Sequence, residues 1–150
     1  MTLGLSASMQ QPLVVSSKKL LVLGGSGFVG SQVVKRASEE LGYEVVAVSR
    51  RGRPADADSF FNREESVTWR CGDLTEQESV RKIFALDGPF DAVIHCMGIL
   101  FDNDSGLGDF NRLASGSGSS PGGASTYDKV TKQSALFAIE AAIEQQEQQK

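Results

Sequence analysis

A glycine-rich turn between a short apolar run and an amphipathic segment constrains the fold of this chain more than any other feature. Four apolar residues, 20–23, are followed by glycines at positions 24, 27 and 30, and apolar residues with helical spacing begin at Phe28. This order predicts a β-strand over 19–23, a tight turn, and a helix over 28–41 that ends at Gly42. One face of the helix is expected to be buried: Val29, Val33, Val34, Ala37 and Leu41.

The glycine spacing, G-x-x-G-x-x-G, suits a loop that holds a pyrophosphate. In a dinucleotide-binding fold the first glycine permits the turn, the second lets the backbone approach the pyrophosphate, and the third lets helix and strand pack closely. Free amides at the start of the helix then face the phosphate charge. Gly24, Gly27 and Gly30 therefore predict a dinucleotide site. An ordinary glycine-rich turn without a ligand is the alternative interpretation.

Three further strands and two further helices follow along the chain. Apolar runs predict strands over 44–49 and 91–97, and VTWRC after a polar linker predicts a short strand over 67–71. The run at 44–49 is continuous, as a parallel sheet covered on both faces requires. A capping box, in which Thr75 bonds the amide of Glu78 and Glu78 reaches back, predicts a helix from 75 to 86. A last helix is expected over 127–146, with a buried side that consists of Val130, Ser134, Phe137, Ala138, Ala141 and Ala142. The pattern predicts an α/β fold: a Rossmann-like doubly wound parallel sheet, truncated to about four strands in the order 3-2-1-4.

Composition limits the chain to one domain of modest acidic charge. At 150 residues it can bury one core, and its net charge of −4 argues against a general nucleic-acid or anionic-membrane surface. No apolar run approaches the length of a membrane span. Cys71 and Cys96 match no metal-ligand spacing, so we predict reduced core thiols and no metal site.

The dinucleotide-binding domain is expected over 18–146. Residues 1–17 contain four serines and no acidic residue, which predicts a disordered leader and leaves a targeting role undecided. Residues 102–125 are rich in Gly, Ser and Asp, which predicts a mobile loop, either a lid over a substrate or an insertion of no consequence. Residues 147–150 predict a polar tail.

The residues after the second strand indicate which dinucleotide is bound. Sites that prefer NAD usually carry an acidic residue here, which binds the ribose hydroxyls. In this chain Arg50 and Arg51 follow Ser49. A guanidinium can donate a fork of hydrogen bonds to a 2′-phosphate, so the pair favours NADP(H) over NAD(H). A solvated basic loop is the alternative.

The ends of the third and fourth strands supply further candidates. Asp73 follows the third strand, where an acidic residue can bind the adenine edge, although simple turn chemistry explains it nearly as well. Met97 and Gly98 end the fourth strand, beside the first, where a doubly wound sheet changes direction and holds its ligand. His95 lies inside an apolar strand, so we predict a neutral core histidine rather than a catalytic one.

Five segments resemble the amino-terminal half of atypical and extended short-chain dehydrogenase/reductases: GGSGFVGS, EVVAVSRRGRP, VTWRCGDL, DAVIHCMGIL and YDKVTKQSALFAIEAA. They are most similar to NAD(P)-binding proteins associated with coenzyme Q biosynthesis in mitochondria and their plastid relatives, and then to the reductase-like accessory subunit of respiratory complex I. The resemblance implies a mitochondrial location, with plastid or cytoplasm as alternatives. By position it implies cofactor contacts from Gly24, Ser26, Gly27, Phe28, Val29 and Gly30 at the phosphates, Arg50 and Arg51 at the adenosine ribose, Asp73 and Leu74 at the adenine, and Met97 and Gly98 at the inner ribose.

The chain departs from its catalytic relatives in one respect. Their proton-donating Tyr-x-x-x-Lys follows a further strand that is not reached before Lys150, and Tyr127 is followed four residues later by Thr131. We therefore assign no catalytic residue. The order 3-2-1-4 would leave the fourth strand as an open edge of Val93, Ile94 and Cys96, and an apolar edge invites pairing. We expect either a fragment of a longer protein or a subunit that a protein partner completes.

Three functions fit these observations. The first is a catalytically incomplete dinucleotide-binding domain, an accessory or regulatory part of an organellar quinone-related or respiratory assembly. The second is the cofactor half of an NADPH-dependent oxidoreductase or isomerase whose Tyr-x-x-x-Lys half is missing. The third is an interaction module with a vestigial nucleotide site. A bulky residue in place of Gly27 separates the third function from the first two. The first two predict loss of the cofactor, because the side chain would occupy the pyrophosphate's approach, whereas the third predicts unchanged partner binding.

Overall fold

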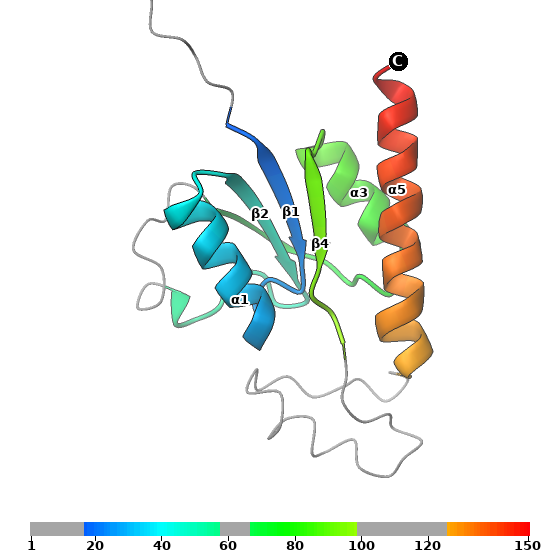
Figure 1. Cartoon of the computed structure of the whole chain (residues 1–150). Helices are drawn as coiled ribbons and strands as arrows, with labels where there is room; N and C mark the ends of the chain where they lie inside the picture. Colours follow the sequence, from blue (N-terminus) through cyan, green and yellow to red (C-terminus); the bar gives the residue numbers. More distant parts are fainter. Residues whose placement is uncertain (1–16, 58–66, 99–125) are drawn as a thin grey trace, which may run out of the picture.

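The structure, a computed structural model, describes residues 17–57, 67–98 and 126–150. Four parallel strands form one sheet: β1 (Lys19–Leu23), β2 (Glu44–Ser49), β3 (Val67–Cys71) and β4 (Ala92–His95). They lie in the order β3-β2-β1-β4 (Figure 1), which confirms the predicted α/β doubly wound fold and its strand order. The predicted loop at 102–125 and nearly all of the predicted leader at 1–17 lie outside the described residues.

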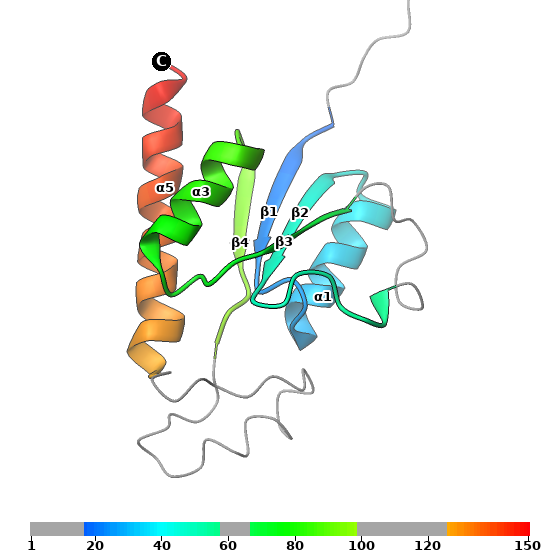
Figure 2. The same ribbon diagram turned by 180° about the vertical axis from the view of Figure 1, so that it is seen from behind.

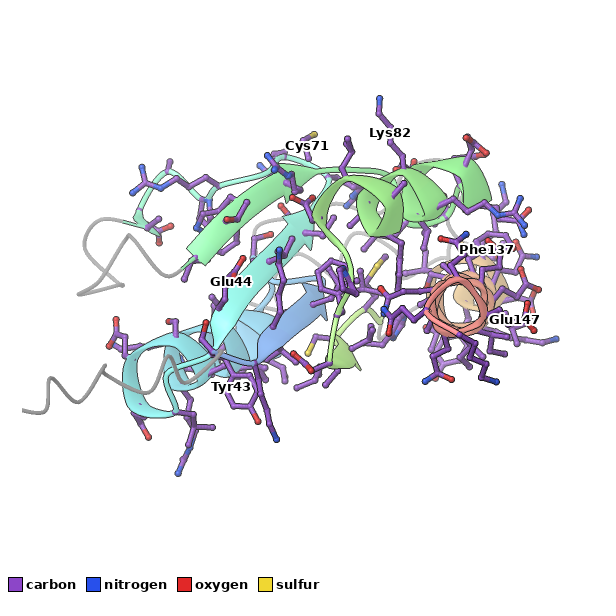
Figure 3. All side chains as sticks on the ribbon, turned by 90° about the horizontal axis from the view of Figure 1, so that it is seen from above. Tyr43, Glu44, Cys71, Lys82, Phe137 and Glu147 are labelled. Carbon is purple, nitrogen blue, oxygen red and sulfur yellow. The ribbon has the colours of Figure 1, made fainter. Side chains whose placement is uncertain are left out.

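Each face of the sheet carries its own apolar core, because successive side chains of a strand point to opposite faces. Leu21 and Leu23 pack with residues of α3 (Gln77–Asp87) and α5 (Ser134–Gln148). Leu20 and Val22 pack on the other face with residues of α1 (Phe28–Lys35). Figures 2 and 3 show α1 and the pair of α3 and α5 on opposite sides of the sheet. Burial on both faces explains why β1 and β2 are continuous apolar runs.

The first helical segment is α1 followed by a π-helical turn, η1 (Arg36–Glu40), and it ends before Gly42, whose φ is +69°. Its buried face differs in part from the prediction, because Val29 and Leu41 are exposed. Val29 precedes the buried Val34 by five residues, which places the two side chains on different sides of an α-helix. The wider turn of η1 changes the angular spacing before Leu41. The residues that are buried are Gly30, Val34, Ala37 and Ser38.

The last helical segment begins with a π-helical turn, η3 (Asp128–Gln133), and continues as α5 to Gln148. The predicted buried side is confirmed: Val130, Ser134, Ala138 and Ala141 are buried, and Phe137 and Ala142 pack against the core while partly exposed. The helix reaches two residues into the segment predicted as a polar tail. In the described part of the chain, no helix has both the length and the apolar character needed to cross a membrane.

Polar contacts hold α5 against α3 and the start of β4. Gln77 donates to Glu140 at 2.8 Å, and Arg81 forms an ion pair with Glu144 at 2.8 Å. The side-chain amide of Gln145 accepts from the backbone N–H of Phe90 at 3.0 Å and donates to its carbonyl at 3.1 Å. These contacts align α5 along α3, so the helix starts at the end of the sheet where the strands end (Figure 1).

The fourth strand is shorter than the predicted 91–97 and borders the described sheet. Its ladder to β1 runs from Leu20 paired with Ala92 to Leu23 paired with His95. One further backbone bond, from the N–H of Cys96 to the carbonyl of Leu23, follows at 2.8 Å before the chain leaves the sheet.

Candidate functional site

The predicted site residues lie along the carboxyl-terminal edge of the sheet, where the parallel strands end. This edge is distinct from the unpaired side of β4. Strands that run in the same direction present their carboxyl ends together, and ligands of open α/β sheets bind at that edge. Figure 1 shows the edge beside the starts of α1 and of the last helix. The chain therefore brings turns that are distant in sequence to one side of the molecule.

The turn after β1 requires glycine at positions 24 and 30, the first and third glycines of the motif. Gly24 has a φ of +84°, a left-handed conformation that side chains disfavour. Its N–H and that of Gly25 both donate to the carbonyl of Val48, at 2.9 and 3.0 Å, which ties the turn to β2. A Cβ at Gly30 would collide with the carbonyl oxygen of Gly24. The turn and the first coil of α1 are therefore in direct backbone contact, as the glycine spacing predicts.

The second glycine opens the turn outward. Gly27 is the N-cap of α1, and its N–H donates to the carbonyl of Gly24 at 3.0 Å. Among the described atoms, a Cβ added at Gly27 would have only that carbonyl oxygen within 4 Å, at 3.2 Å. The first backbone bond within the helix is the one that Ser31 donates to Gly27. The N–H groups of Phe28, Val29 and Gly30 therefore precede the intrahelical ladder and can bind an anion.

The turn after β2 holds the two predicted arginines at the same edge. The buried Ser49 donates from its Oγ to the carbonyl of Gly52 at 2.7 Å, and its own carbonyl accepts from the N–H of Gly52 at 3.2 Å. Gly52 has a φ of +70°, so the chain reverses tightly. Arg50 and Arg51 lie exposed between these two residues. The turn places two cations in a rigid, solvent-facing segment.

The residues after β3 form an Asx turn rather than the predicted capping box. Asp73 Oδ1 accepts from both the N–H and the hydroxyl of Thr75, at 2.9 and 2.7 Å. The capping-box prediction is wrong, because α3 begins at Gln77 with Glu76 as its N-cap. The carboxylate two residues earlier accepts from both donors of Thr75, which places Thr75 in the turn before the helix and not at its N-cap.

The carboxylate of Asp73 stays ionised more readily than an ordinary aspartate. The hydrogen bonds from Thr75 lower its pKa most, and the charges of Arg50 and Lys129 add to the effect. The next residue, Leu74, is only 2% exposed and packs in the core beside α3 and α5. A ligand at this edge could therefore meet the Asp73 side chain but only the backbone of Leu74.

The residues after β4 lie against the glycine turn. A Cβ at Gly24 would come within 3.0 Å of both the carbonyl oxygen of Cys96 and the Cγ of Met97. Gly98 is exposed, and a Cβ added there would meet no described atom within 4 Å. The structure thus joins Met97 to the turn of Gly24, with Gly98 open beside them.

His95 is held in place by Ser134, which helical spacing predicts to be buried but which no sequence motif marks as a partner of His95. Its Nε2 lies 2.7 Å from Oγ of Ser134, and burial lowers the pKa of the imidazole. The neutral form predicted from the apolar strand agrees with this direction. The pairing crosses 39 residues. Lys129, whose charge acts on Asp73, was likewise missed, since it lies in the first turn of a helical segment to which the sequence assigned no site role.

One of the two cysteines differs from the prediction. Cys71 is exposed, and its thiol donates to the carbonyl of Arg50 at 2.8 Å, so it is not a core thiol. It lies at the end of β3, an outer strand of the sheet, and its side chain is exposed there (Figure 3). Cys96 is partly buried, and burial raises the pKa of its thiol. Within the described ranges, no group of three or more His, Cys, Asp or Glu could hold a metal ion.

A parallel sheet in the order β3-β2-β1-β4 with a glycine turn leading into α1 defines a nucleotide-binding α/β domain of the Rossmann type. Comparison with known families makes the assignment narrower. The chain belongs to the NAD dependent epimerase/dehydratase family, whose model matches residues 20–109. The predicted membership of the extended and atypical short-chain dehydrogenase/reductases is confirmed at this level.

Two relatives come from organelle-bearing organisms. An uncharacterised chloroplastic protein of Arabidopsis thaliana is 50% identical over 60 residues, which are 40% of this chain and 19% of that protein. MIOREX complex component 2 of Saccharomyces cerevisiae is 28% identical over 135 residues, which are 79% of this chain and 47% of that protein. The chain therefore spans less than half the length of these relatives.

Solved structures share the fold. ElxO with NADP bound aligns with a TM-score of 0.61 and 20% identity, over 88% of this chain and 51% of that one. The Bordetella bronchiseptica enzyme WbmH in complex with NAD+ aligns with a TM-score of 0.59 and 17% identity, over 87% of this chain and 36% of that one. At such identities the likeness establishes the architecture alone.

Proposed function

We propose that this chain binds a nicotinamide dinucleotide, NADP(H) in preference to NAD(H), as a catalytically incomplete domain that serves as an accessory or regulatory part of an organellar quinone-related or respiratory assembly. One observation supports this proposal. The open glycine turn, the start of α1, and the turn of Arg50 and Arg51 lie together where the parallel strands end. The dinucleotide would supply hydride chemistry; the residues of this chain would hold it.

Each part of the edge has a distinct task in holding the dinucleotide. Gly27 leaves room for the pyrophosphate, and the amides of Phe28 and Val29 can donate to its oxygens. Asp73, ionised and oriented by Thr75, can accept a hydrogen bond from the adenine amino group. Met97 and Gly98 would line the inner ribose, where Gly98 leaves the edge open.

The preference for NADP(H) follows from the charge at the end of β2. A carboxylate there would bind ribose hydroxyls, whereas Arg50 and Arg51 present two guanidinium groups from a turn that Ser49 and Gly52 fix. A guanidinium donates two parallel hydrogen bonds to a phosphate. Both a bound NADP and a bound NAD+ occur among the solved relatives, so the preference rests on these arginines.

Catalytic incompleteness rests on the tyrosines. The sequence has two, and the fourth residue after each is Ala47 after Tyr43 and Thr131 after Tyr127. Neither forms the Tyr-x-x-x-Lys pair in which a lysine lowers the pKa of the tyrosine for proton transfer. Tyr127 is exposed at the start of the last helical segment. The described residues thus offer binding groups at the edge without that acid–base pair.

The proposed organellar role rests on two relatives. The proposed protein partner rests on the unpaired side of β4. The two relatives are named for a chloroplast and for the MIOREX complex, which supports an organelle, in first place the mitochondrion. In the described sheet β4 is a terminal strand that pairs with β1 alone, and its Ile94 is 38% exposed. A strand contributed by a partner, or by further chain, would cover this apolar edge.

Thermal unfolding with NADPH and, separately, with NADH tests the proposal. Ligand that binds only the folded state raises the midpoint as its concentration exceeds the dissociation constant. We expect a larger rise with NADPH than with NADH, and no rise with either for Gly27→Leu. Gln32→Leu is the matched control, because it adds the same side chain at an exposed position of α1 away from the turn. Absence of any rise in the unmodified chain would contradict dinucleotide binding.

A second candidate function is the cofactor half of an NADPH-dependent oxidoreductase or isomerase. Two observations favour it: the chain matches the family model, and it covers less than half the length of its relatives. It predicts the same binding but a Tyr-x-x-x-Lys in further chain. Hydride transfer by a longer form of the protein, and its loss on replacing that tyrosine, would establish it.

A further inference from the structure

The carboxylate of Asp73 has one oxygen that can serve a ligand. Its Oδ1 accepts both hydrogen bonds from Thr75, at 2.9 and 2.7 Å, whereas Oδ2 accepts none from the residues that the structure describes. The side chain is exposed just after the end of β3. Thr75 thus fixes the orientation of the carboxylate through one oxygen and leaves the other as an acceptor at the edge where the parallel strands end.

Two cations from different elements belong to the surroundings of this carboxylate. Arg50 lies in the turn after β2, and Lys129 lies in η3, at the start of the last helical segment. After the larger effect of the Thr75 hydrogen bonds, the charges of both cations help to lower the pKa of Asp73. Figures 1 and 2 both show the chain between β3 and α3 beside the start of the last helical segment. Residues 50, 73 and 129 therefore form one charged cluster.

The backbone of η3 holds Lys129 at this position. The N–H of Lys129 donates to Oγ1 of Thr126 at 3.2 Å, and the N–H of the buried Val130 donates to the Thr126 carbonyl at 3.0 Å. The side chain of Lys129 is exposed and forms no ion pair within 4 Å among the described residues, whereas Lys132 pairs with Asp128 at 3.2 Å. The Lys129 ammonium is thus a donor beside the acceptor of Asp73.

An acceptor next to a cationic donor is complementary to the edge of an adenine base. The amino group of adenine donates a hydrogen bond, and the neighbouring ring nitrogen N1 accepts one. A phosphate would suit the same place poorly, because the ionised carboxylate of Asp73 repels it. Hypoxanthine reverses the adenine pattern, since a carbonyl oxygen replaces the amino group and N1 carries a proton. The cluster therefore favours adenine.

We propose that Lys129 binds the adenine base of the dinucleotide together with Asp73. Oδ2 of Asp73 accepts from the amino group, and the Lys129 ammonium donates to N1. This inference rests on the proposed function, because the base is part of the dinucleotide, and it adds a residue of the last helical segment to the site. The task of Lys129 differs from that of Arg50, since the base is common to NADPH and NADH whereas the 2′-phosphate is not.

Isothermal titration with NADPH and with NADH is the first test. Lys129→Met removes the ammonium and keeps an unbranched side chain, and it is expected to weaken the binding of both dinucleotides by the same factor, about tenfold. Lys129→Arg, which keeps a cationic donor, is expected to retain most of the affinity. Lys132→Met is the matched control in the same turn and should change neither affinity. A loss confined to NADPH would place Lys129 at the 2′-phosphate and overturn the proposal.

A dinucleotide with an altered base tests which part of the ligand Lys129 contacts. The probe is deamino-NADPH, which carries hypoxanthine in place of adenine. The unmodified chain is expected to bind it at least about tenfold more weakly than NADPH, because two acceptors and two donors then face each other. Lys129→Met should narrow that ratio, since it removes one of the two mismatches. An equal loss of affinity for both ligands would place Lys129 at the pyrophosphate and overturn the proposal.

The two levels of the proposal fail in different ways. A chain that binds neither NADPH nor NADH would overturn the proposed function and this inference with it. Binding of NADPH that Lys129→Met leaves unchanged would overturn this inference alone. Because Lys129 is exposed, the thermal midpoint of Lys129→Met without ligand is expected to equal that of the unmodified chain, so a loss of affinity at an unchanged midpoint reports on the site and not on the fold.

Discussion

The imidazole of His95 on β4 and the hydroxyl of Ser134 at the start of α5 lie 2.7 Å apart, Nε2 to Oγ. The Ser134 hydroxyl donates its single proton to the carbonyl of Val130, one turn earlier. It can therefore only accept from His95, which assigns the proton of the neutral imidazole to Nε2. This bond joins the edge strand to the helix that covers it.

Ser134→Ala is expected to destabilise the chain by about 1–2 kcal/mol, because it leaves the Nε2–H of a partly buried imidazole without an acceptor. Ser38→Ala is the control. Ser38 is also buried, but its hydroxyl makes a local bond of 3.3 Å to the carbonyl of Lys35. Urea unfolding of both variants gives the comparison, and equal losses would remove the special role of the His95 contact.

The stability of the chain should fall as pH drops below about 6.5, the ordinary pKa of histidine. Burial lowers the pKa of His95 in the folded state, so the unfolded state binds more protons in the interval between the folded and unfolded values. The stabilisation is complete above the unfolded pKa and is lost as pH falls toward the folded one. His95→Gln, which keeps a donor toward Ser134, should flatten the urea midpoint in that interval. An unaltered pH profile would show that another group is responsible.

Arg70 at the end of β3 and Asp87 at the end of α3 form a bidentate ion pair, with Nε–Oδ2 at 2.8 Å and Nη2–Oδ1 at 2.7 Å. The Asp87 side chain is 8% exposed, and its hydrogen bond and charge raise the pKa of Arg70. Asp87→Ala removes both bonds, and Arg70→Lys loses the fork. We expect a double-mutant cycle to give a coupling of about 1–3 kcal/mol, as for a charge-assisted pair. Additive losses would show that the two residues act independently.

Gly24→Ala should destabilise the chain more than Gly42→Ala. Both glycines have positive φ, so both variants carry roughly 1–2 kcal/mol of backbone strain. Only at Gly24 would the added Cβ also press on the carbonyl oxygen of Cys96, at 3.0 Å; at Gly42 it would meet no described atom within 4 Å. Thermal unfolding of the two variants measures the difference, and the opposite ranking would contradict the contact between turn and β4.

Arg50→Ala should weaken NADPH binding by about tenfold or more, because a charge-assisted fork to the 2′-phosphate is lost, and should change NADH binding little. Arg53→Ala is the matched control, an exposed arginine of the same loop that follows Gly52. Isothermal titration with both dinucleotides separates the cases. Equal losses of affinity for NADPH and NADH would show that Arg50 does not bind the 2′-phosphate.

Local pattern was enough to place three of the strands. The segments 19–23, 44–49 and 67–71 were predicted at the bounds of β1, β2 and β3. The first two are largely apolar because both faces of the sheet are covered there, whereas β3 was predicted as a short strand after a polar linker. The turn of Gly24 and the buried side of α5 followed from local pattern as well. β4 is shorter than its sequence predicts, because its ladder to β1 runs only from Ala92 to His95.

Local sequence pattern gave a wrong prediction at two positions, Thr75 and Cys71. The spacing of Thr75 and Glu78 predicted a capping box, but Thr75 donates to the carboxylate of Asp73 in a turn and the helix begins two residues later, at Gln77. Cys71 is apolar in character, yet β3 is an outer strand and leaves its last residue exposed. Neither outcome is visible in residue spacing.

Periodicity and glycine spacing thus sufficed for three of the strands and for the turn that leads into α1, because these depend on residues close together in the chain. The sheet order followed from the doubly wound fold that the glycine turn indicates. Only packing decided which distant residues meet: His95 with Ser134, Arg70 with Asp87, and Met97 with Gly24. The physical reason is that such contacts arise from how α3 and α5 lie against the sheet, and that arrangement is determined by the fit of side chains over the whole core.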